Sequence, residues 1–390
     1  MKKLLLSCDD FLYRFNGKIF ASSLEKYDFY QRYLRVFDEL RLVCRCEEIT
    51  AMKNGFVPLD QDSRIEVVPV PMFHGPVQYA KLYFKVGKSI RGIVDGCDAA
   101  VLRIPSTIAM RVGKQVVEAG VPYACEVVYD GEDGWKSSVG ITRLIWKRID
   151  KDMRQLCLCA DGVSCVTQHY LQQHYFSNKP NAFTSYYSSL ALDKSFYSAA
   201  KLYPLHETII IAHVTNQIGF HGRKGNLELI QAVSLLKKEN YKIRVQFVGE
   251  VRDNSPARIH EFAVQLGVED NIEFLGYLNR KELDEFLNNV DLFVLPTKAE
   301  GLPRVIIEAM AKGLPCITTP VSGCPELINK HFLVNYNDVS GLANKIKELI
   351  DNSQLYEQTS RENYEMSWQY EASVLQKRRD DFYNKLKTRI

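Results

Sequence analysis

Short apolar runs rich in valine and isoleucine alternate along the whole chain with longer segments of helical periodicity. This alternation is typical of parallel sheets built from strand-helix-strand units. In the first half, the runs predicted to be strands are 4–8, 40–46, 65–70, 99–105, 123–130 and 162–167. In the second half, they are 208–215, 243–250, 272–278, 291–297, 315–320 and 331–336. The pattern therefore predicts an α/β protein with two tandem doubly wound parallel sheets.

The stretch 177–207 between the two sets of strands has weak periodicity, many small polar residues and two prolines, so it is predicted to connect two domains. A chain of 390 residues is long enough for two cores. We predict a first domain over 1–198, which includes this connection, and a second over 199–366. A terminal helix over 367–390 is expected to pack back on the first domain. Its aromatic anchors would be Trp368, Tyr370 and Phe382.

Composition narrows the classes of protein that this chain can belong to. Apolar residues make up 46% and charged residues 25%, as in ordinary globular enzymes. A net charge of +3 argues against a nucleic-acid partner. The ten cysteines include no C-x-x-C pair, which predicts neither a zinc site nor a disulfide framework and suits a reducing compartment.

The segment "MKKLLLSCDD" has a short apolar run followed by acidic residues, so it is predicted to be a buried strand rather than a signal peptide. No apolar stretch is long enough to span a bilayer. We therefore expect a protein of the cytoplasm, either soluble or peripheral on the inner face of the cell membrane.

Two glutamates, Glu300 and Glu308, flank a turn that opens a predicted helix. The free amides and the dipole of a helix N-terminus favour phosphate, and a glycine lets the backbone approach it closely. Phosphate would repel both carboxylates, so their sensible partners are hydroxyl groups of a sugar on one side and of a ribose on the other. The residues of the turn itself are Gly301, Leu302 and Pro303. The pattern predicts a site for a sugar joined to a nucleoside diphosphate.

The whole stretch "VLPTKAEGLPRVIIEAMAKGLPCITTPVSGCPELI", residues 294–328, resembles the hallmark motif of the retaining GT-B glycosyltransferases of glycosyltransferase family 4. The resemblance implies two Rossmann-like domains and a terminal helix that crosses back to the first. It also implies that Glu300 approaches the donor sugar and Glu308 holds the ribose. Outside this motif, a helix cap at Glu300 and a solvated charge at Glu308 would explain both residues.

A second stretch, "HVTNQIGFHGRKGNLELIQAV" at 213–233, resembles the phosphate-binding loop of the same family. The resemblance implies that Lys224 neutralises the diphosphate as it leaves and that Arg223 and Gly225 line the donor site. Many members carry a Gly-Arg pair a few residues earlier. The chain reads Thr-Asn-Gln-Ile there, at 215–218, so Arg223 could replace the missing arginine or could belong to a solvated turn.

Three further positions are implied to contact the donor. Gly249 lies at the end of the second strand of the second half, and Tyr277 and Leu278 lie at the end of the third, where the backbone meets the base in this family. Buried strand ends that need glycine for close packing would explain the same residues. In the first half, Gly17 of "RFNGKIF" replaces the glycine-rich loop of other members and is expected to approach the donor phosphate.

The first half resembles a polysaccharide-assembly branch of the family through "FYQRYLRVFDELRLVCR", "PYACEVVYD" and "GVSCVTQHYLQQHYF". Asp130 lies close to where many relatives place a histidine that contacts the donor sugar. Asp130 is therefore a candidate catalytic residue. Either Asp130 or Glu126 could position the acceptor hydroxyl and accept its proton. The alternative is that "YDGEDG" is a polar turn.

A helix predicted over 141–156 separates apolar and basic side chains. Its apolar face holds Ile141, Ile145, Ile149 and Leu156, its basic face holds Arg143, Lys147 and Arg154, and Trp146 lies at the border. Another segment places Lys81, Lys85 and Lys88 on one face. Basic stripes attract anionic lipid surfaces, although solvated helix faces show charge runs too.

These observations predict a hexosyltransferase that moves a sugar from a nucleoside diphosphate sugar to a growing, lipid-linked polysaccharide, lipopolysaccharide or capsule intermediate. No metal site is predicted, because Lys224 and helix amides could replace a divalent ion. A nucleotide-sugar epimerase of the same fold and an inactive glycan-binding module are the alternatives. A dehydrogenase is disfavoured, since neither half has G-x-G-x-x-G after its first strand. The base, sugar, acceptor, linkage and oligomeric state are not defined by the sequence.

Overall fold

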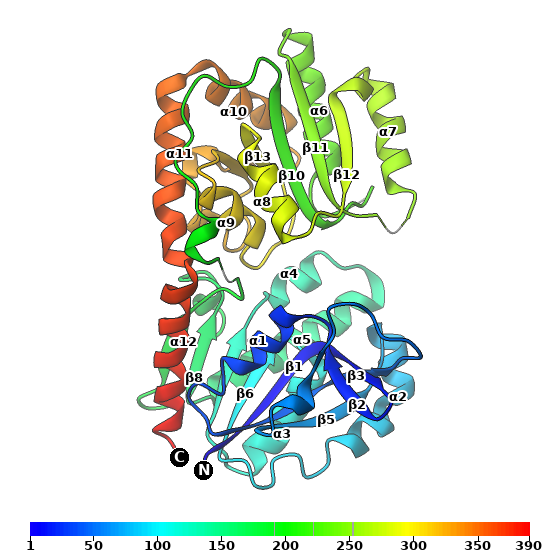
Figure 1. Ribbon diagram of the computed structural model, residues 1–390, viewed down its shortest axis with the longest axis vertical. Helices are drawn as coiled ribbons and strands as arrows, with labels where there is room; N and C mark the ends of the chain where they lie inside the picture. The colour runs from blue at the N-terminus through cyan, green and yellow to red at the C-terminus, as the bar shows by residue number, and fades with distance from the viewer. Residues whose placement is uncertain (191, 221, 252) are drawn as a thin grey trace. The chain divides into compact units, whose positions relative to one another are not determined.

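A computed structural model describes residues 1–190, 192–220, 222–251 and 253–390 (Figure 1). These residues form two compact units. The first comprises Met1–Tyr187 together with Gln376–Ile390, and the second is Ser188–Leu375. The division that the sequence predicts after residue 198 therefore lies inside the second unit.

The first unit is built on one mainly parallel sheet. Its parallel part runs in the order β5-β3-β1-β6-β7-β8-β9, and β2 and β4 add an antiparallel extension to the far end of β1. The strands are β1 (Lys3–Phe15), β2 (Lys18–Ala21), β3 (Glu39–Glu48), β4 (Val57–Pro58), β5 (Ile65–Pro71), β6 (Ala99–Ile104), β7 (Tyr123–Val127), β8 (Gly162–Cys165) and β9 (Phe183–Tyr186). The prediction of a parallel α/β sheet is confirmed, while β2, β4 and β9 were not predicted.

Strand β1 continues well past the predicted 4–8 because it turns into a hairpin with β2. Asn16 and Gly17 form the two-residue connection, with φ angles of 48° and 78°. Both angles lie in the left-handed region, as a tight hairpin of type I′ requires, and Asn-Gly is its preferred sequence. The conformation of this turn is enough to explain Gly17.

Helices pack against this sheet. They are α1 (Leu24–Gln31), α2 (Gly75–Ser89), α3 (Thr107–Glu118), α4 (Gly131–Lys136) and α5 (Gly140–Leu158), with short 3-10 turns η1 (Leu59–Gln61) and η2 (Leu171–Gln173). Helix α3 lies close to β6 and α5 at Gly113, where an added methyl group would lie 2.9 Å from Leu102 and from Leu156. Such close packing excludes water from the core.

A buried carboxylate joins the last helix to the sheet of the first unit. Glu126 on β7 is 2% exposed and accepts hydrogen bonds from Tyr33, Tyr187 and Tyr383 and from the guanidinium of Arg103, whose Nη1 lies 2.9 Å from Oε2. Burial alone would raise the pKa of Glu126, but Arg103 and the phenol donors lower it below its ordinary value. The carboxylate is ionised, and each of its oxygens already accepts two hydrogen bonds. The expectation that Glu126 could position an acceptor hydroxyl is therefore wrong.

The second unit contains a smaller sheet in which all strands are parallel. Its order is β12-β11-β10-β13-β14. The strands are β10 (Ile209–Gln217), β11 (Ile243–Glu250), β12 (Ile272–Gly276), β13 (Leu292–Leu295) and β14 (Cys316–Thr318). The helices are α6 (Asn226–Lys238), α7 (Ser255–Leu266), α8 (Arg280–Asn288), α9 (Arg304–Ala311), α10 (Val339–Asp351) and α11 (Ser353–Ser367). The strand predicted over 331–336 is wrong, because η6 (Lys330–Phe332) and a single bridge between Leu333 and Thr318 occupy that stretch.

The strand order of the second unit predicts where a ligand binds. Strand β10 pairs with β11 on one side and with β13 on the other, so the chain changes direction across the sheet between β10 and β13. In open parallel sheets, ligands bind at this switch point, beyond the carboxyl ends of the strands. A ligand site is therefore expected at the loops after β10 and β13.

The end of the chain is not the single helix predicted over 367–390. Helix α11 ends at Ser367, a 3-10 turn η7 (Trp368–Tyr370) follows, and α12 (Ala372–Lys387) starts afterwards. Trp368 stacks on Tyr197 of the second unit with ring centroids 4.1 Å apart. Phe382 instead packs on Phe183 of the first unit at 5.0 Å. Of the three predicted anchors, Trp368 and Tyr370 thus belong to the second unit and Phe382 belongs to the first.

Candidate active site

The loops after β10 and β13 bring two of the predicted residues together. The Nζ atom of Lys224 forms an ion pair with Oε1 of Glu300. The two side chains are 32% and 12% exposed, so the pair is partly shielded but still reaches solvent. Their sequence separation is large, and the switch-point topology is what makes them neighbours.

Backbone contacts hold these two loops in place. The carbonyl oxygen of Arg223 accepts hydrogen bonds from the amide of Lys298 at 2.7 Å and from Oγ1 of Thr297 at 3.0 Å. Gly225 has a φ angle of 79°, and a Cβ atom there would lie 2.2 Å from the carbonyl oxygen of Pro296. Only glycine fits this turn. Backbone contacts between the two loops therefore fix the position of Lys224 beside Glu300.

A neutral histidine supports the floor of the site. Nδ1 of His213 on β10 donates to the carbonyl oxygen of Val294 on β13, at 2.9 Å. Burial lowers the pKa of His213 to about 4, so the ring is uncharged at neutral pH. At the start of α6, Nδ2 of Asn226 donates to the carbonyl oxygen of Gly219 at 2.7 Å. The first bond joins β10 to β13, and the second closes the connection that carries Lys224 on itself.

Glu308 on α9 is paired with an arginine that the sequence did not reveal. Nη1 of Arg280 lies 3.4 Å from Oε1 of the largely buried Glu308. The guanidinium of Arg280 also lies over the ring of Phe196, 4.5 Å from its centroid, and Nζ of Lys312 lies 4.2 Å from the same centroid. Arg280 is the first residue of α8. Phe196 thus supports the cation that holds Glu308.

We expect Arg280→Ala to raise the KM for the donor by about tenfold and to change kcat less. The physical reason is that the Glu308 carboxylate loses the cation beside it, and a charge-assisted hydrogen bond contributes about 1.5–3 kcal/mol. Steady-state kinetics over a range of donor concentrations measures both constants. Arg280→Lys should restore part of the effect, and Lys281→Ala on the exposed side of the same helix is the matched control. Equal KM values for Arg280→Ala and the wild type would contradict this role.

The turn between the two glutamates is buried and ordered by its own bonds. Gly301, Leu302 and Pro303 are buried, and α9 begins at Arg304. The amide of Gly323 donates to the carbonyl oxygen of Gly301 at 2.9 Å. The Gly323 amide is therefore already bonded within the protein.

The other predicted donor contacts lie at the same edge of the sheet. Gly249 is the next-to-last residue of β11, and a methyl group there would lie 2.6 Å from the carbonyl oxygen of Thr215 on β10, so close packing is enough to explain this glycine. After β12, Tyr277 is exposed and Leu278 is half-buried. The exposed side chain of Arg223 lies in the turn between β10 and α6. Contacts of these residues with a donor stay predictions.

Asp130 in the first unit has a structural role. It is fully buried and caps α4, with Oδ1 accepting from the amide of Glu132 at 2.9 Å. Tyr175 also donates to Oδ1 and Tyr170 donates to Oδ2, each at 2.9 Å. The geometry gives no support to a catalytic Asp130, and that role stays a prediction.

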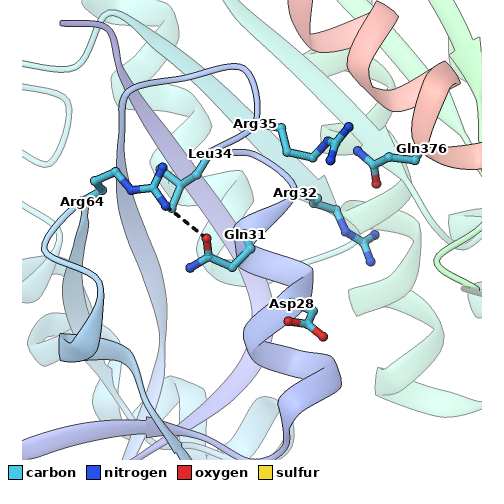
Figure 2. A pocket seen from close by; sticks show the side chains of 7 residues that line it. All are labelled: Asp28, Gln31, Arg32, Leu34, Arg35, Arg64 and Gln376. Atoms are coloured by element: carbon cyan, nitrogen blue, oxygen red, sulfur yellow. Dashed lines mark hydrogen bonds between the residues drawn. The ribbon is translucent and has the colours of Figure 1, made fainter. Parts of the chain in front are cut away.

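Figure 2 shows a polar hollow in the first unit, at the end of α1. Two of its three arginines are paired with carboxylates within the unit. Arg35 bonds to Asp380, with Nη2 and Oδ2 3.0 Å apart, and Arg64 bonds to Asp62, with Nη2 and Oδ2 2.8 Å apart. The lining residues are Asp28, Gln31, Arg32, Leu34, Arg35, Arg64 and Gln376. None of them is a predicted site residue.

Among residues 1–190, 192–220, 222–251 and 253–390, no group of three or more histidine, cysteine, aspartate or glutamate side chains could hold a metal ion. Over the same residues, no helix has the length and apolar character needed to cross a membrane.

Comparison with protein families gives the site a family context. Residues 216–366, which carry Lys224, Glu300 and Glu308, match the family model described as "Glycosyl transferases group 1". Residues 216–366 thus carry a glycosyl transferase group 1 domain, and the chain has the GT-B fold. This fold is similar to that of sucrose-phosphate synthase from Thermosynechococcus elongatus, with a TM-score of 0.72, 14% identity and full coverage of both chains. It is also similar to HepE of Anabaena in complex with UDP, with a TM-score of 0.68, 16% identity and full coverage of both chains.

Curated relatives match this chain over very different shares of its length. Protein CapJ of Staphylococcus aureus is 23% identical over 86% of this chain and 82% of its own length. The putative colanic acid biosynthesis glycosyltransferase WcaL of Salmonella typhimurium is 31% identical over 36% of this chain and 35% of its own length. Membership of glycosyltransferase family 4 in particular stays a prediction.

Proposed function

We propose that this glycosyltransferase moves a hexosyl group from a nucleoside diphosphate sugar to a hydroxyl of a growing, lipid-linked polysaccharide. The observation that carries the proposal is the Lys224–Glu300 ion pair at the switch point of the second unit, with Glu308 on the helix that follows Glu300. A similar structure supports the donor class, since HepE of Anabaena was solved with UDP and with UDP-glucose.

In the proposed donor complex, Lys224 exchanges partners. In the structure its ammonium pairs with Glu300. A diphosphate carries more negative charge than one carboxylate, so Lys224 turns to it and stabilises the nucleoside diphosphate as it leaves. Glu300 is then released to accept hydrogen bonds from hydroxyls of the donor sugar. Glu308, held by Arg280, accepts from the ribose hydroxyls.

We propose that transfer retains the configuration of the donor sugar. The bond from the anomeric carbon to the diphosphate breaks, and the bond to the acceptor oxygen forms on the same face. The acceptor proton leaves with the departing diphosphate. NMR spectroscopy of the first-formed product reads the configuration of the new bond directly, and an inverted product would exclude this course.

We expect the reaction to proceed without a divalent metal ion. Lys224 already places one positive charge where the diphosphate is to leave, and the first amides of α9 could add partial positive charge. Activity in excess EDTA should equal activity in Mg²⁺ within about twofold. An enzyme that needs a catalytic metal would instead lose several kcal/mol of transition-state stabilisation in EDTA. A loss in EDTA that Mg²⁺ or Mn²⁺ restores would contradict this expectation.

Relatives named for colanic acid and capsular polysaccharide biosynthesis support a polysaccharide-assembly role, since WcaL and CapM of Staphylococcus aureus match this chain at 31% and 30% identity over 36% of its length. Such an acceptor would be presented on a lipid carrier.

A donor screen by nucleotide release tests the proposal. The purified protein is incubated with each common nucleoside diphosphate sugar, with and without a lipid-linked glycan acceptor. One donor should release nucleotide in an acceptor-dependent manner, and Glu308→Ala should slow this release. If the donor alone yields a new nucleotide sugar, the protein is an epimerase. If no donor is consumed with any acceptor, the inactive glycan-binding module remains.

A further inference from the structure

The corner between α4 and α5 exposes large apolar side chains that folding leaves in water. Val139 is 84% exposed, Ile141 is 70% exposed and Leu144 is 62% exposed. All three lie within the loop and the first turns of α5. A cluster of exposed aliphatic side chains, in contrast to single ones, marks a contact surface for a partner or a membrane.

This corner is also strongly cationic. Between residues 134 and 149 the chain carries Lys136, Arg143, Lys147 and Arg148 and no aspartate or glutamate. Arg143 and Lys147 lie over the ring of Trp135, with the cations 5.6 Å and 5.3 Å from its centroid. Within the described part of the chain, neither of these two cations forms an ion pair with a carboxylate. Their charge is therefore available to an anionic partner.

The exposed surface of α5 differs from the apolar and basic faces that the sequence predicts over 141–156. Trp146 is not an exposed border residue, because it packs against Gly134, where an added methyl group would lie 2.4 Å from its ring. Arg154 forms ion pairs with Asp150 and Glu132, with nitrogen-oxygen distances of 3.1 Å and 3.3 Å. Leu156 is buried. The exposed surface is therefore confined to residues 135–148.

We propose that residues 135–148 form a docking surface for an anionic lipid bilayer. Trp135, Val139, Ile141 and Leu144 would enter the interface between headgroups and acyl chains. The cations of Arg143 and Lys147 would lie at the level of the phosphates, as in other interfacial helices. Charge complementarity selects a lipid surface over an uncharged protein partner. Docking would bring the protein to a lipid-linked acceptor, and in this respect the proposal rests on the proposed function.

Helix α2 of the same unit presents side chains of the same kind. Val77 is exposed and Phe84 is strongly exposed, and Lys81, Lys85 and Lys88 lie on the same helix and are also exposed. Positions 77, 81, 84 and 88 share one face at helical spacing. The first unit thus offers cations beside exposed apolar side chains on two helices.

Vesicle flotation with the full-length protein tests the surface. The vesicles contain phosphatidylcholine alone or with about 30% phosphatidylglycerol, which sets the surface potential. We expect binding to the anionic vesicles only, and a loss of most binding at about 0.5 M NaCl, because salt screens exposed charges. Ile141→Ser with Leu144→Ser, and Arg143→Gln with Lys147→Gln, should each weaken binding by about tenfold or more.

Matched variants separate this surface from general effects. Lys238→Gln with Lys242→Gln removes two exposed cations elsewhere, and Val117→Ser with Val264→Ser removes two exposed apolar groups elsewhere. Both controls should bind like the wild type. The proposal is overturned if the wild type ignores anionic vesicles, or if the 141/144 variant binds as well as the wild type. A dimer in solution that Ile141→Ser with Leu144→Ser dissociates would assign the surface to a second copy instead.

Vesicle binding is measured without donor or acceptor. A failure here therefore leaves the proposed sugar transfer untouched. Conversely, a protein that binds vesicles but consumes no donor would refute the transfer and keep the docking surface.

Discussion

Lys224→Ala should reduce kcat for sugar transfer by about 100- to 1000-fold, as expected when a preorganised group that stabilises a leaving anion is removed. The ammonium of Lys224 lies beside Glu300 in a turn whose backbone leaves little freedom. Without it, the departing diphosphate would lose its nearest side-chain cation in the proposed complex. Steady-state kinetics with the donor identified by nucleotide release gives the measurement.

Two variants make this result specific. Lys238→Ala removes an exposed lysine at the other end of α6 and should leave kcat within about twofold of the wild type, as surface substitutions usually do. Glu300→Gln keeps the size of the side chain but removes its charge, and it should also lower kcat strongly. If Lys224→Ala keeps full activity while it folds normally, the diphosphate must lie elsewhere.

Glu126→Ala should destabilise the first unit by about 3–5 kcal/mol, since removing one partner of a buried ion pair leaves the other charge uncompensated. Arg103 would lose its carboxylate, and three buried tyrosines would lose their acceptor. Urea unfolding followed by circular dichroism measures the change in the free energy of unfolding.

A milder variant keeps this prediction testable if Glu126→Ala does not fold. Tyr383→Phe removes one donor and should cost about 1.5–3 kcal/mol, the usual contribution of a hydrogen bond to a charged group. Glu118→Ala, on the exposed end of α3, should change stability by less than about 0.5 kcal/mol. Equal unfolding midpoints for Glu126→Ala and Glu118→Ala would show that the buried cluster does not hold α12.

Much of the fold followed from local patterns. The buried parallel strands are short apolar runs, and β3, β5 and β11 occur almost where the sequence places them. The exceptions have tertiary causes. The second half of β1 is stabilised by its hairpin with β2, and residues 331–336 pass the sheet edge with one bridge only. Neither contact can be read from periodicity.

The site was predictable where motif and topology coincide. Lys224 and Glu300 follow adjacent strands of one sheet, so the motif and the strand order lead to the same pair. Arg280 was missed because its partner Glu308 is far away in the sequence and its support, Phe196, lies in a stretch predicted as a connection. Asp130 was selected because many relatives of the resembled family place a histidine that contacts the donor sugar close to this position. Its burial beneath two tyrosines depends on tertiary packing.

Isothermal titration calorimetry with UDP, GDP, ADP, CDP and dTDP tests most directly whether the loops after β10 and β13 hold a nucleoside diphosphate. At least one of these nucleotides should bind the wild type, and Lys224→Ala and Glu308→Ala should each raise its Kd by about 10- to 100-fold, in line with about 1.5–3 kcal/mol per lost charged contact. Lys238→Ala should bind like the wild type. An unchanged Kd in both Lys224→Ala and Glu308→Ala would contradict the assignment of the donor site.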